Sequence, residues 1–83
     1  MAAKVKMFTL STCSHCKATK KFMHDNGIAF DFVDIDLLQG DDKQKALEEV
    51  MQYNPSRSFP TIIIGDTIII GFRENDIREV LGI

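Results

Sequence analysis

The spacing of hydrophobic and polar positions changes several times along the chain, and each change predicts a new element. Residues 4–10 alternate and then become continuously apolar, which is typical of a strand that enters a core. Residues 14–26 repeat apolar side chains at helical spacing, and Gly27 follows as a helix stop. Apolar residues then dominate 28–35, which predicts a second strand. This β-α-β unit requires a right-handed crossover and a parallel strand pair.

A second helix is predicted after a loop at residues 37–40. Asp41 and Asp42 place negative charge at its start, where the helix dipole favours it. The helix should end before residues 53–55, because Pro55 cannot continue it. Its predicted buried stripe consists of Ala46, Leu47, Val50 and Met51.

The last third of the chain predicts a hairpin and a short helix. β-branched runs at 61–64 and 67–70 are separated by a Gly-Asp dipeptide, which is a signal for two antiparallel strands. A final helix is expected at about 74–81. The predicted order is β-α-β-α-β-β-α, an α/β fold whose compact form is a four-stranded mixed sheet with helices on both faces.

Composition limits the size of the protein and the kind of partner it binds. The 83 residues suffice for one small core, so we expect 1–83 to form a single domain. A net charge of −2 with both signs interspersed gives no footprint for nucleic acid or an anionic membrane. The first six residues lack the apolar core of a signal peptide, and the apolar runs are too short to span a bilayer. We expect a cytoplasmic monomer.

The strongest chemical signal is the segment Cys13-Ser14-His15-Cys16. Two cysteines at this spacing near a β-α-β pattern predict a redox pair. Cys13 falls at the start of the first helix, where free backbone amides and the dipole stabilise a thiolate; thiols at such positions titrate at roughly 3.5–7.5 instead of ~8.5. We therefore expect Cys13 to attack a substrate disulfide and Cys16, one turn further on, to resolve the mixed disulfide.

The cysteines also have two other interpretations: they could be a buried structural pair, or they could bind zinc. Tetrahedral zinc needs four ligands, and besides the cysteines the chain has only His15 and His24. No metal is therefore expected. A protonated His15 could help to hold the Cys13 thiolate, or it could be an exposed imidazole with little influence; both remain open.

Lysines 17, 20 and 21 follow the cysteines along the helix. Their charges could favour a thiolate or an anionic substrate, but a solvated helix face is the interpretation we favour.

A second signal is Phe59-Pro60-Thr61, a proline directly before a β-branched strand. Proline in a sheet is confined to an edge, a strand start or a turn. Pro60 is therefore a candidate for a cis peptide bond that would expose the Phe59 backbone to an extended peptide. The alternative is an ordinary trans proline that begins a strand.

Together these landmarks resemble the glutaredoxin family along nearly the whole chain. The matching segments are Cys13-Ser14-His15-Cys16, Arg57-Ser58-Phe59-Pro60 (similar to the family's Arg-Thr-Val-Pro) and Gly71-Phe72 (where the family commonly has Gly-Gly).

The resemblance implies the thioredoxin fold, a cis bond at Pro60 and Cys13 as the nucleophile. It also implies that Arg57 and the Phe59 backbone contact glutathione or a peptide, and that no cofactor is tightly bound. The full set of residues expected to bind substrate or glutathione is His15, Arg57, Phe59, Pro60, Gly71 and Phe72.

Two departures bear on the electron source. The family's Gly-Gly-x-Thr-Asp segment reads Gly71-Phe72-Arg73-Glu74-Asn75, and the usual lysine ahead of the cysteines is absent. Both weaken the expected glutathione site. Ala18-Thr19-Lys20 and Gly71-Phe72-Arg73 look like glutaredoxin-like redoxins that serve ribonucleotide reductase and are recharged by thioredoxin reductase.

The sequence thus predicts a dithiol–disulfide oxidoreductase that reduces protein or glutathione mixed disulfides. Its electrons would come from glutathione or thioredoxin reductase, and ribonucleotide reductase is a candidate target. Two alternatives remain: two chains that hold an iron–sulfur cluster through Cys13 and glutathione, or an interaction domain with idle cysteines.

Overall fold

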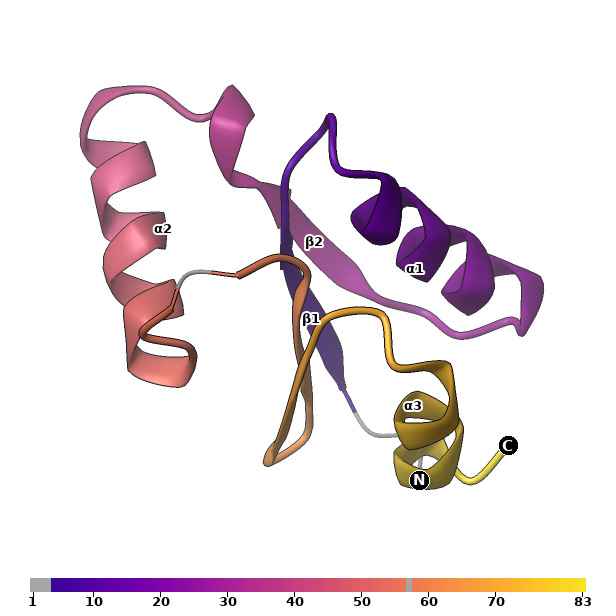
Figure 1. The fold of residues 1–83 in the computed structure, drawn as a ribbon. Coiled ribbons are helices and arrows are strands. Elements are labelled where there is room, and N and C mark those ends of the chain that lie inside the picture. The colour runs from indigo at the N-terminus through magenta and orange to yellow at the C-terminus, as the bar shows by residue number, and fades with distance from the viewer. Residues whose placement is uncertain (1–3, 57) are drawn as a thin grey trace.

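The computed structural model describes residues 4–56 and 58–83, which form a mixed sheet with helices on either side (Figure 1). The order of elements is the predicted β-α-β-α-β-β-α, with one additional 3-10 turn, η1. The elements are β1 (Val5–Thr9), α1 (Ser14–Asp25), β2 (Asp31–Asp34), η1 (Ile35–Leu37), α2 (Gly40–Tyr53), β3 (Thr61–Ile64), β4 (Thr67–Ile70) and α3 (Glu74–Leu81).

The strands lie in the order β2-β1-β3-β4. β1 is parallel to β2 and antiparallel to β3, as the β-α-β unit and the hairpin require. β3 and β4 pair from Thr61↔Ile70 to Ile64↔Thr67, so only Gly65 and Asp66 connect them. Gly65 has a φ of 58°, a left-handed conformation that suits glycine in a two-residue hairpin turn. The predicted mixed sheet is confirmed.

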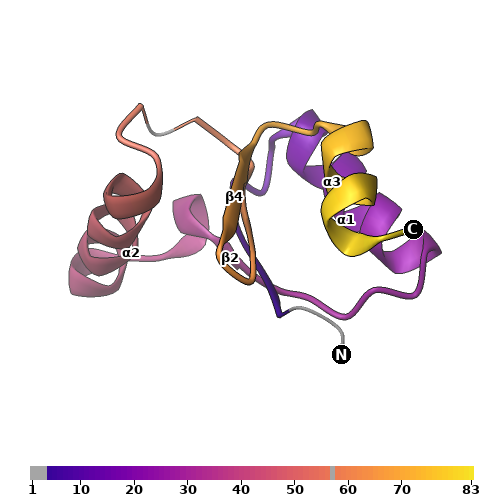
Figure 2. The ribbon, with the colours of Figure 1, turned by 90° about the horizontal axis from the view of Figure 1, so that it is seen from below.

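The helices cover both faces of the sheet, as predicted. Figure 2 shows α1 and α3 together on one side and α2 alone on the other. The α1/α3 side holds the larger apolar cluster, formed by Val5, Met7, Phe22, Met23, Ile62, Ile64, Ile69 and Ile77. The α2 side holds a smaller one, formed by Phe8, Ile35 and Val50.

Two details differ from the sequence prediction. The second strand covers only 31–34 of the predicted 28–35, because its pairing with β1 begins at Lys6↔Asp31. Ile28 and Phe30 were apolar for another reason: they pack against the larger cluster from outside the sheet. Met51 is 42% exposed, not buried. Successive residues of a helix point about 100° apart, so Met51 points away from the buried side that Val50 occupies.

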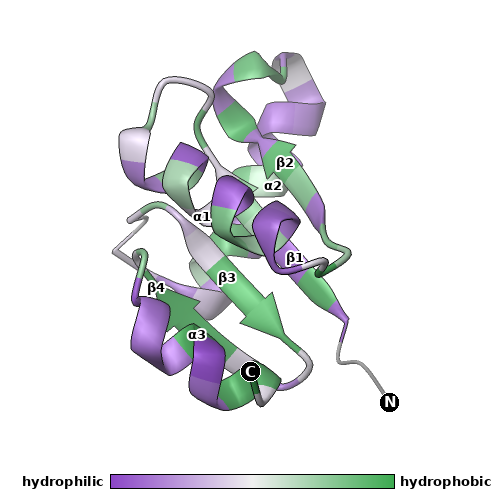
Figure 3. Cartoon of the chain, turned by 90° about the vertical axis from the view of Figure 1, so that its right-hand side faces the viewer, coloured by the Kyte–Doolittle hydropathy of each residue, from purple (hydrophilic) through white to green (hydrophobic). Residues whose placement is uncertain are grey.

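Hydropathy follows this layered arrangement. Figure 3 shows β3 and β4 coloured largely hydrophobic, whereas the outward turns of α3 are hydrophilic. Within residues 4–56 and 58–83, no helix has the length and apolar character needed to cross a bilayer.

Candidate active site

The segments that the sequence analysis selected lie at one end of the strands, where β1 and β4 end and β3 begins. The pairing of β1 with β3 reaches Phe8↔Thr61 at this end. Beyond it, Leu10 and Phe59 pack against the same small cluster under α2. On the next strand, the Gly71 amide donates to the Pro60 carbonyl at 2.8 Å. The cysteine turn, the Phe59–Pro60 segment and the Gly71 turn therefore lie side by side.

Cys13 is the N-cap of α1, as predicted. Its backbone is extended (φ −82°, ψ 120°), and its Sγ accepts the Cys16 backbone N–H at 3.2 Å. The Cys13 amide in turn donates to the Leu10 carbonyl at 3.2 Å, which closes the turn between β1 and the helix. The Cys13 sulfur thus accepts a hydrogen bond from one of the backbone amides that the first turn of a helix leaves without a partner.

The two cysteines differ in exposure. Both are free thiols; Cys13 is partly exposed, whereas Cys16 is 0% exposed. Burial and the neighbouring Cys13 raise the pKa of the Cys16 thiol to about 12, while the Leu10 amide and Lys20 act in the opposite direction. Of the two sulfur-bearing side chains, that of Cys13 is therefore the more accessible from outside the protein.

A carboxylate anchors the loop that carries Cys13. Asp36 in η1 accepts the Ser11 backbone N–H at 2.8 Å and also the Ser11 hydroxyl. These hydrogen bonds lower the pKa of Asp36. The end of β2 thus fixes the turn that leads to Cys13, a contact that the sequence analysis missed because the two residues are far apart in the chain.

Lys20 is not on a solvated helix face, so that expectation was wrong for this residue. Its Nζ donates to Asp34 Oδ1 at 2.9 Å and lies 4.0 Å from the centre of the Phe32 ring. The Lys20 side chain is 22% exposed, whereas Lys21 is 76% exposed and pairs with Asp25. The i, i+4 spacing of Cys16 and Lys20 was the available sequence signal.

His15 is exposed on the first turn of α1, and its carbonyl accepts the Thr19 hydroxyl at 2.8 Å. Its effect on Cys13 stays a prediction.

The Phe59–Pro60 peptide bond is cis, which confirms that expectation, and Pro60 is buried. The preceding loop is tied down by Asn54, a buried residue that the sequence analysis did not select. Asn54 donates to the Ser58 carbonyl at 3.0 Å and accepts the Ser56 hydroxyl at 2.6 Å. An asparagine at a helix end next to proline is a known turn former, and that was the signal. Arg57 lies outside the described residues.

Gly71 and Phe72 contribute differently to the site. Gly71 has a φ of 88°, a left-handed conformation that favours glycine there. Phe72 turns its ring toward α1, where its centroid lies 5.9 Å from that of Phe22. The ring therefore packs on the core, and a ligand contact by Phe72 stays a prediction.

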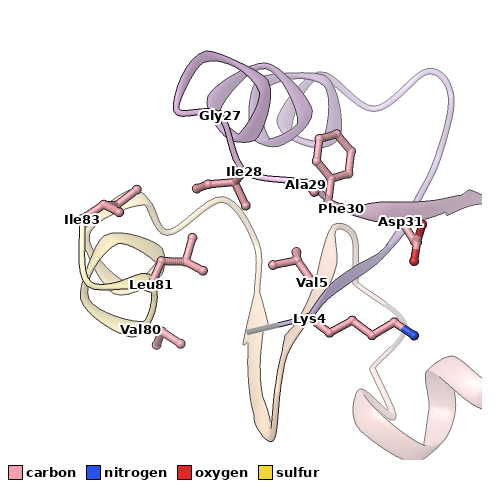
Figure 4. Close-up of a pocket in the computed structure, with 10 residues that line it drawn as sticks. All are labelled: Lys4, Val5, Gly27, Ile28, Ala29, Phe30, Asp31, Val80, Leu81 and Ile83. Atoms are coloured by element: carbon pink, nitrogen blue, oxygen red, sulfur yellow. The ribbon is translucent and has the colours of Figure 1, made fainter. Parts of the chain in front are cut away.

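Other features lie away from this end of the strands. In the described part of the chain, no three His, Cys, Asp or Glu side chains gather in a way that could hold a metal ion. A cavity of about 660 Å³ lies at the opposite end of α1, below Gly27. Figure 4 shows Val5, Ile28 and Leu81 around it, and no cysteine contributes. Since α1 has 12 residues and is about 18 Å long, this cavity is remote from Cys13.

Known proteins resemble both the sequence and the fold. The glutaredoxin family model matches residues 5–69. The solved glutaredoxin of Methanosarcina mazei Go1 is 51% identical, with a TM-score of 0.88, over 98% of this chain and 80% of that one. Methanosarcina acetivorans methanoredoxin is 46% identical, with a TM-score of 0.93, over 99% and 87%. NrdH-redoxin from Escherichia coli is 28% identical, with a TM-score of 0.76, over 92% of both chains.

These matches agree with the geometry of the site. The four-stranded mixed sheet is the thioredoxin fold, and the cysteine pair lies at the tip of its first helix. The chain therefore belongs to the glutaredoxin family and is a thiol–disulfide oxidoreductase.

Proposed function

We propose that this protein is a dithiol reductase of protein disulfides, with Cys13 as the attacking thiol and Cys16 as the resolving thiol. The supporting observation is the contrast within one helical turn. Cys13 is partly exposed and bonded to an amide, and Cys16 is buried directly behind it.

The reaction has two exchanges. The Cys13 thiolate attacks one sulfur of the substrate disulfide, forming a mixed disulfide and releasing the other substrate sulfur as a thiolate. Cys16, as its thiolate, then attacks the Cys13 sulfur; the Cys13–Cys16 bond forms and the second substrate thiolate leaves. Both leaving thiolates take up protons, so two electrons and two protons pass from the protein to the substrate.

The substrate segment would lie along Phe59 and Pro60, beside the cysteine turn. Support comes from the packing of Leu10 and Phe59 against the same cluster, and from the Asn54 hydrogen bonds that fix the loop. An extended chain there could use main-chain hydrogen bonds, which recognise many protein partners without demanding one sequence. We also propose that Arg57 and Gly71 bind the substrate.

Thioredoxin reductase is the electron source we propose, in place of glutathione. Phe72 stands where the family commonly has glycine, and its ring is committed to Phe22. The similar E. coli NrdH-redoxin has a thioredoxin-like activity profile. Ribonucleotide reductase is one candidate target. We further propose that residues 1–83 act as a single cytoplasmic domain and as a monomer.

A two-arm reduction assay tests the reductase proposal. Oxidised protein is offered NADPH with thioredoxin reductase, or NADPH with glutathione and glutathione reductase, and insulin disulfide reduction is followed. Faster turnover in the first arm supports the proposal, and faster turnover in the second assigns glutathione instead. Turnover in neither arm would contradict a disulfide reductase.

The same assay separates the two cysteines. Cys13→Ser should lose turnover, whereas Cys16→Ser should accumulate a mixed disulfide with insulin, visible by mass spectrometry. The cluster-binding alternative instead predicts a coloured dimer that contains glutathione; a colourless monomer supports the reductase.

A further inference from the structure

Lys20 is a charged residue of α1 that has no role in the exchange reaction described above. It lies one turn after Cys16, on the same side of the helix. Two neighbours hold it: Asp34 Oδ1 lies 2.9 Å from its Nζ, and the centre of the Phe32 ring lies 4.0 Å from the same atom. Asp34 is itself fixed, since it accepts the Thr9 hydroxyl at 2.5 Å. Thr9 is fully buried and also donates to the Val33 carbonyl at 3.2 Å.

Fixing Lys20 in this arrangement contributes little to the stability of the fold. Lysine side chains lose much rotamer freedom when they are fixed, and partly buried ion pairs recover little net stability. Lys17 and Lys21, its neighbours on α1, remain exposed to solvent. Of these three lysines, only Lys20 is partly buried.

The environment of Cys16 changes at the moment when it must react. In the dithiol, Cys16 faces burial and a hydrogen-bonded Cys13, both of which raise its pKa. Once Cys13 is in a mixed disulfide, it carries no charge and no thiol proton. The influence of Cys13 is then lost. Burial, the largest cause of the raised pKa, remains, and the Leu10 backbone and the Lys20 ammonium act against it in favour of the Cys16 thiolate.

We propose that Lys20 is a positioning residue for the resolving step: its ammonium, held by Asp34 and Phe32, stabilises the Cys16 thiolate that attacks the mixed disulfide. Among the described residues, the charged or titratable groups that act on the Cys16 sulfur are Cys13 and Lys20 of α1. Asp34 of β2 acts through Lys20, and His15 and Lys17 are exposed beside it in the chain. The inference rests on the proposed assignment of Cys16 as the resolving thiol.

The resolving step can be observed by itself. Reduced protein mixed with one equivalent of dithionitrobenzoate releases one yellow thionitrobenzoate when Cys13 attacks. The other thionitrobenzoate stays on Cys13 as a mixed disulfide, and it is released when Cys16 attacks the Cys13 sulfur. The rate of the second release, followed against pH in a stopped-flow instrument, reports how readily Cys16 ionises.

Four variants separate charge from structure. Lys20→Met should slow the second release at neutral pH by about three- to tenfold and move its profile to higher pH. Lys20→Arg should restore the profile, because the charge returns. Asp34→Asn keeps the cation but removes the partner that holds it, so its second release should slow less than that of Lys20→Met. Lys21→Met removes an exposed charge from the same helix, so its second release should stay within about twofold of the parent.

The outcomes are distinguishable from each other and from failure of the proposed function. An unchanged profile in Lys20→Met overturns the inference, and so does equal slowing in Lys20→Met and Asp34→Asn, which would assign the effect to structure. Should Lys20→Met fold poorly, the double variant Lys20→Met/Asp34→Asn leaves no unpaired carboxylate and should show the same slowing. Absence of the first release, or its persistence in Cys13→Ser, would instead contradict the role of Cys13.

Discussion

The two ends of helix α1 show how one element serves two purposes. Its N-terminal end is polar and connected: Cys13 accepts an amide hydrogen, and Ser11 and Asp36 fix the preceding turn. Its C-terminal half supplies packing, because Phe22 and Met23 are buried in the larger cluster. Chemistry is therefore placed where the helix leaves amides free, and stability where its side chains can be covered by the sheet. Changes at one end should affect activity, and changes at the other should affect folding.

The largest effect is expected at the reactive end. Cys13→Ser replaces the attacking sulfur with a hydroxyl that does not ionise at neutral pH, so disulfide reduction should fall by at least about a thousandfold. Thermal unfolding of the reduced variant should match that of the parent, since serine can still cap the helix. Substantial turnover in Cys13→Ser would show that the two ends do not divide the work in this way.

Met23→Ala tests the packing end. Met23 is completely buried, and truncation of such a side chain typically costs about 2–5 kcal/mol of unfolding free energy. Urea denaturation measures this loss, with Lys21→Ala, exposed on the same helix, as a control expected to change stability by about 0.5 kcal/mol or less. Folded Met23→Ala should keep its specific activity; a selective loss of activity would link the two ends.

The comparison also shows what the sequence could predict. Periodicity identified the strands and the helices, because burial leaves a repeating pattern in the chain. The cysteine pair was equally clear, since its partners are three residues apart. By contrast, Asp34 and Asp36 approach α1 only after β2 has paired with β1. Contacts that depend on strand pairing leave no local pattern, so the environment of Lys20 could not be predicted.

The burial of Cys16 should make the stability of the folded protein depend on pH in the alkaline range. The folded-state pKa of Cys16 is raised from 9.0 to about 12, so the folded protein retains a proton that the unfolded chain releases. The resulting stability is fully present below pH 9.0 and is lost as pH rises toward 12. Reduced parent protein should therefore lose stability more steeply over this range than Cys16→Ala. Parallel curves in denaturant titrations would show that Cys16 is not protected by burial.

The smallest expected effect is at the anchor of the cysteine turn. Asp36→Ala removes both bonds to Ser11 and should lower the rate of disulfide reduction by about two- to fivefold, because Cys13 is held less firmly. The pKa of Asp36 is lowered in the fold, so its contribution is present at neutral pH and disappears as the carboxyl protonates. The stability difference between parent and variant should narrow below about pH 4, as measured by acid denaturation.

Brief alkylation of the reduced protein with iodoacetamide, followed by peptide mass spectrometry, tests the central assignment most directly. A partly exposed cysteine at the tip of α1 and a buried one behind it predict label on Cys13, with Cys16 modified only after denaturation. Label that appears first on Cys16, or equally on both residues, would contradict the account.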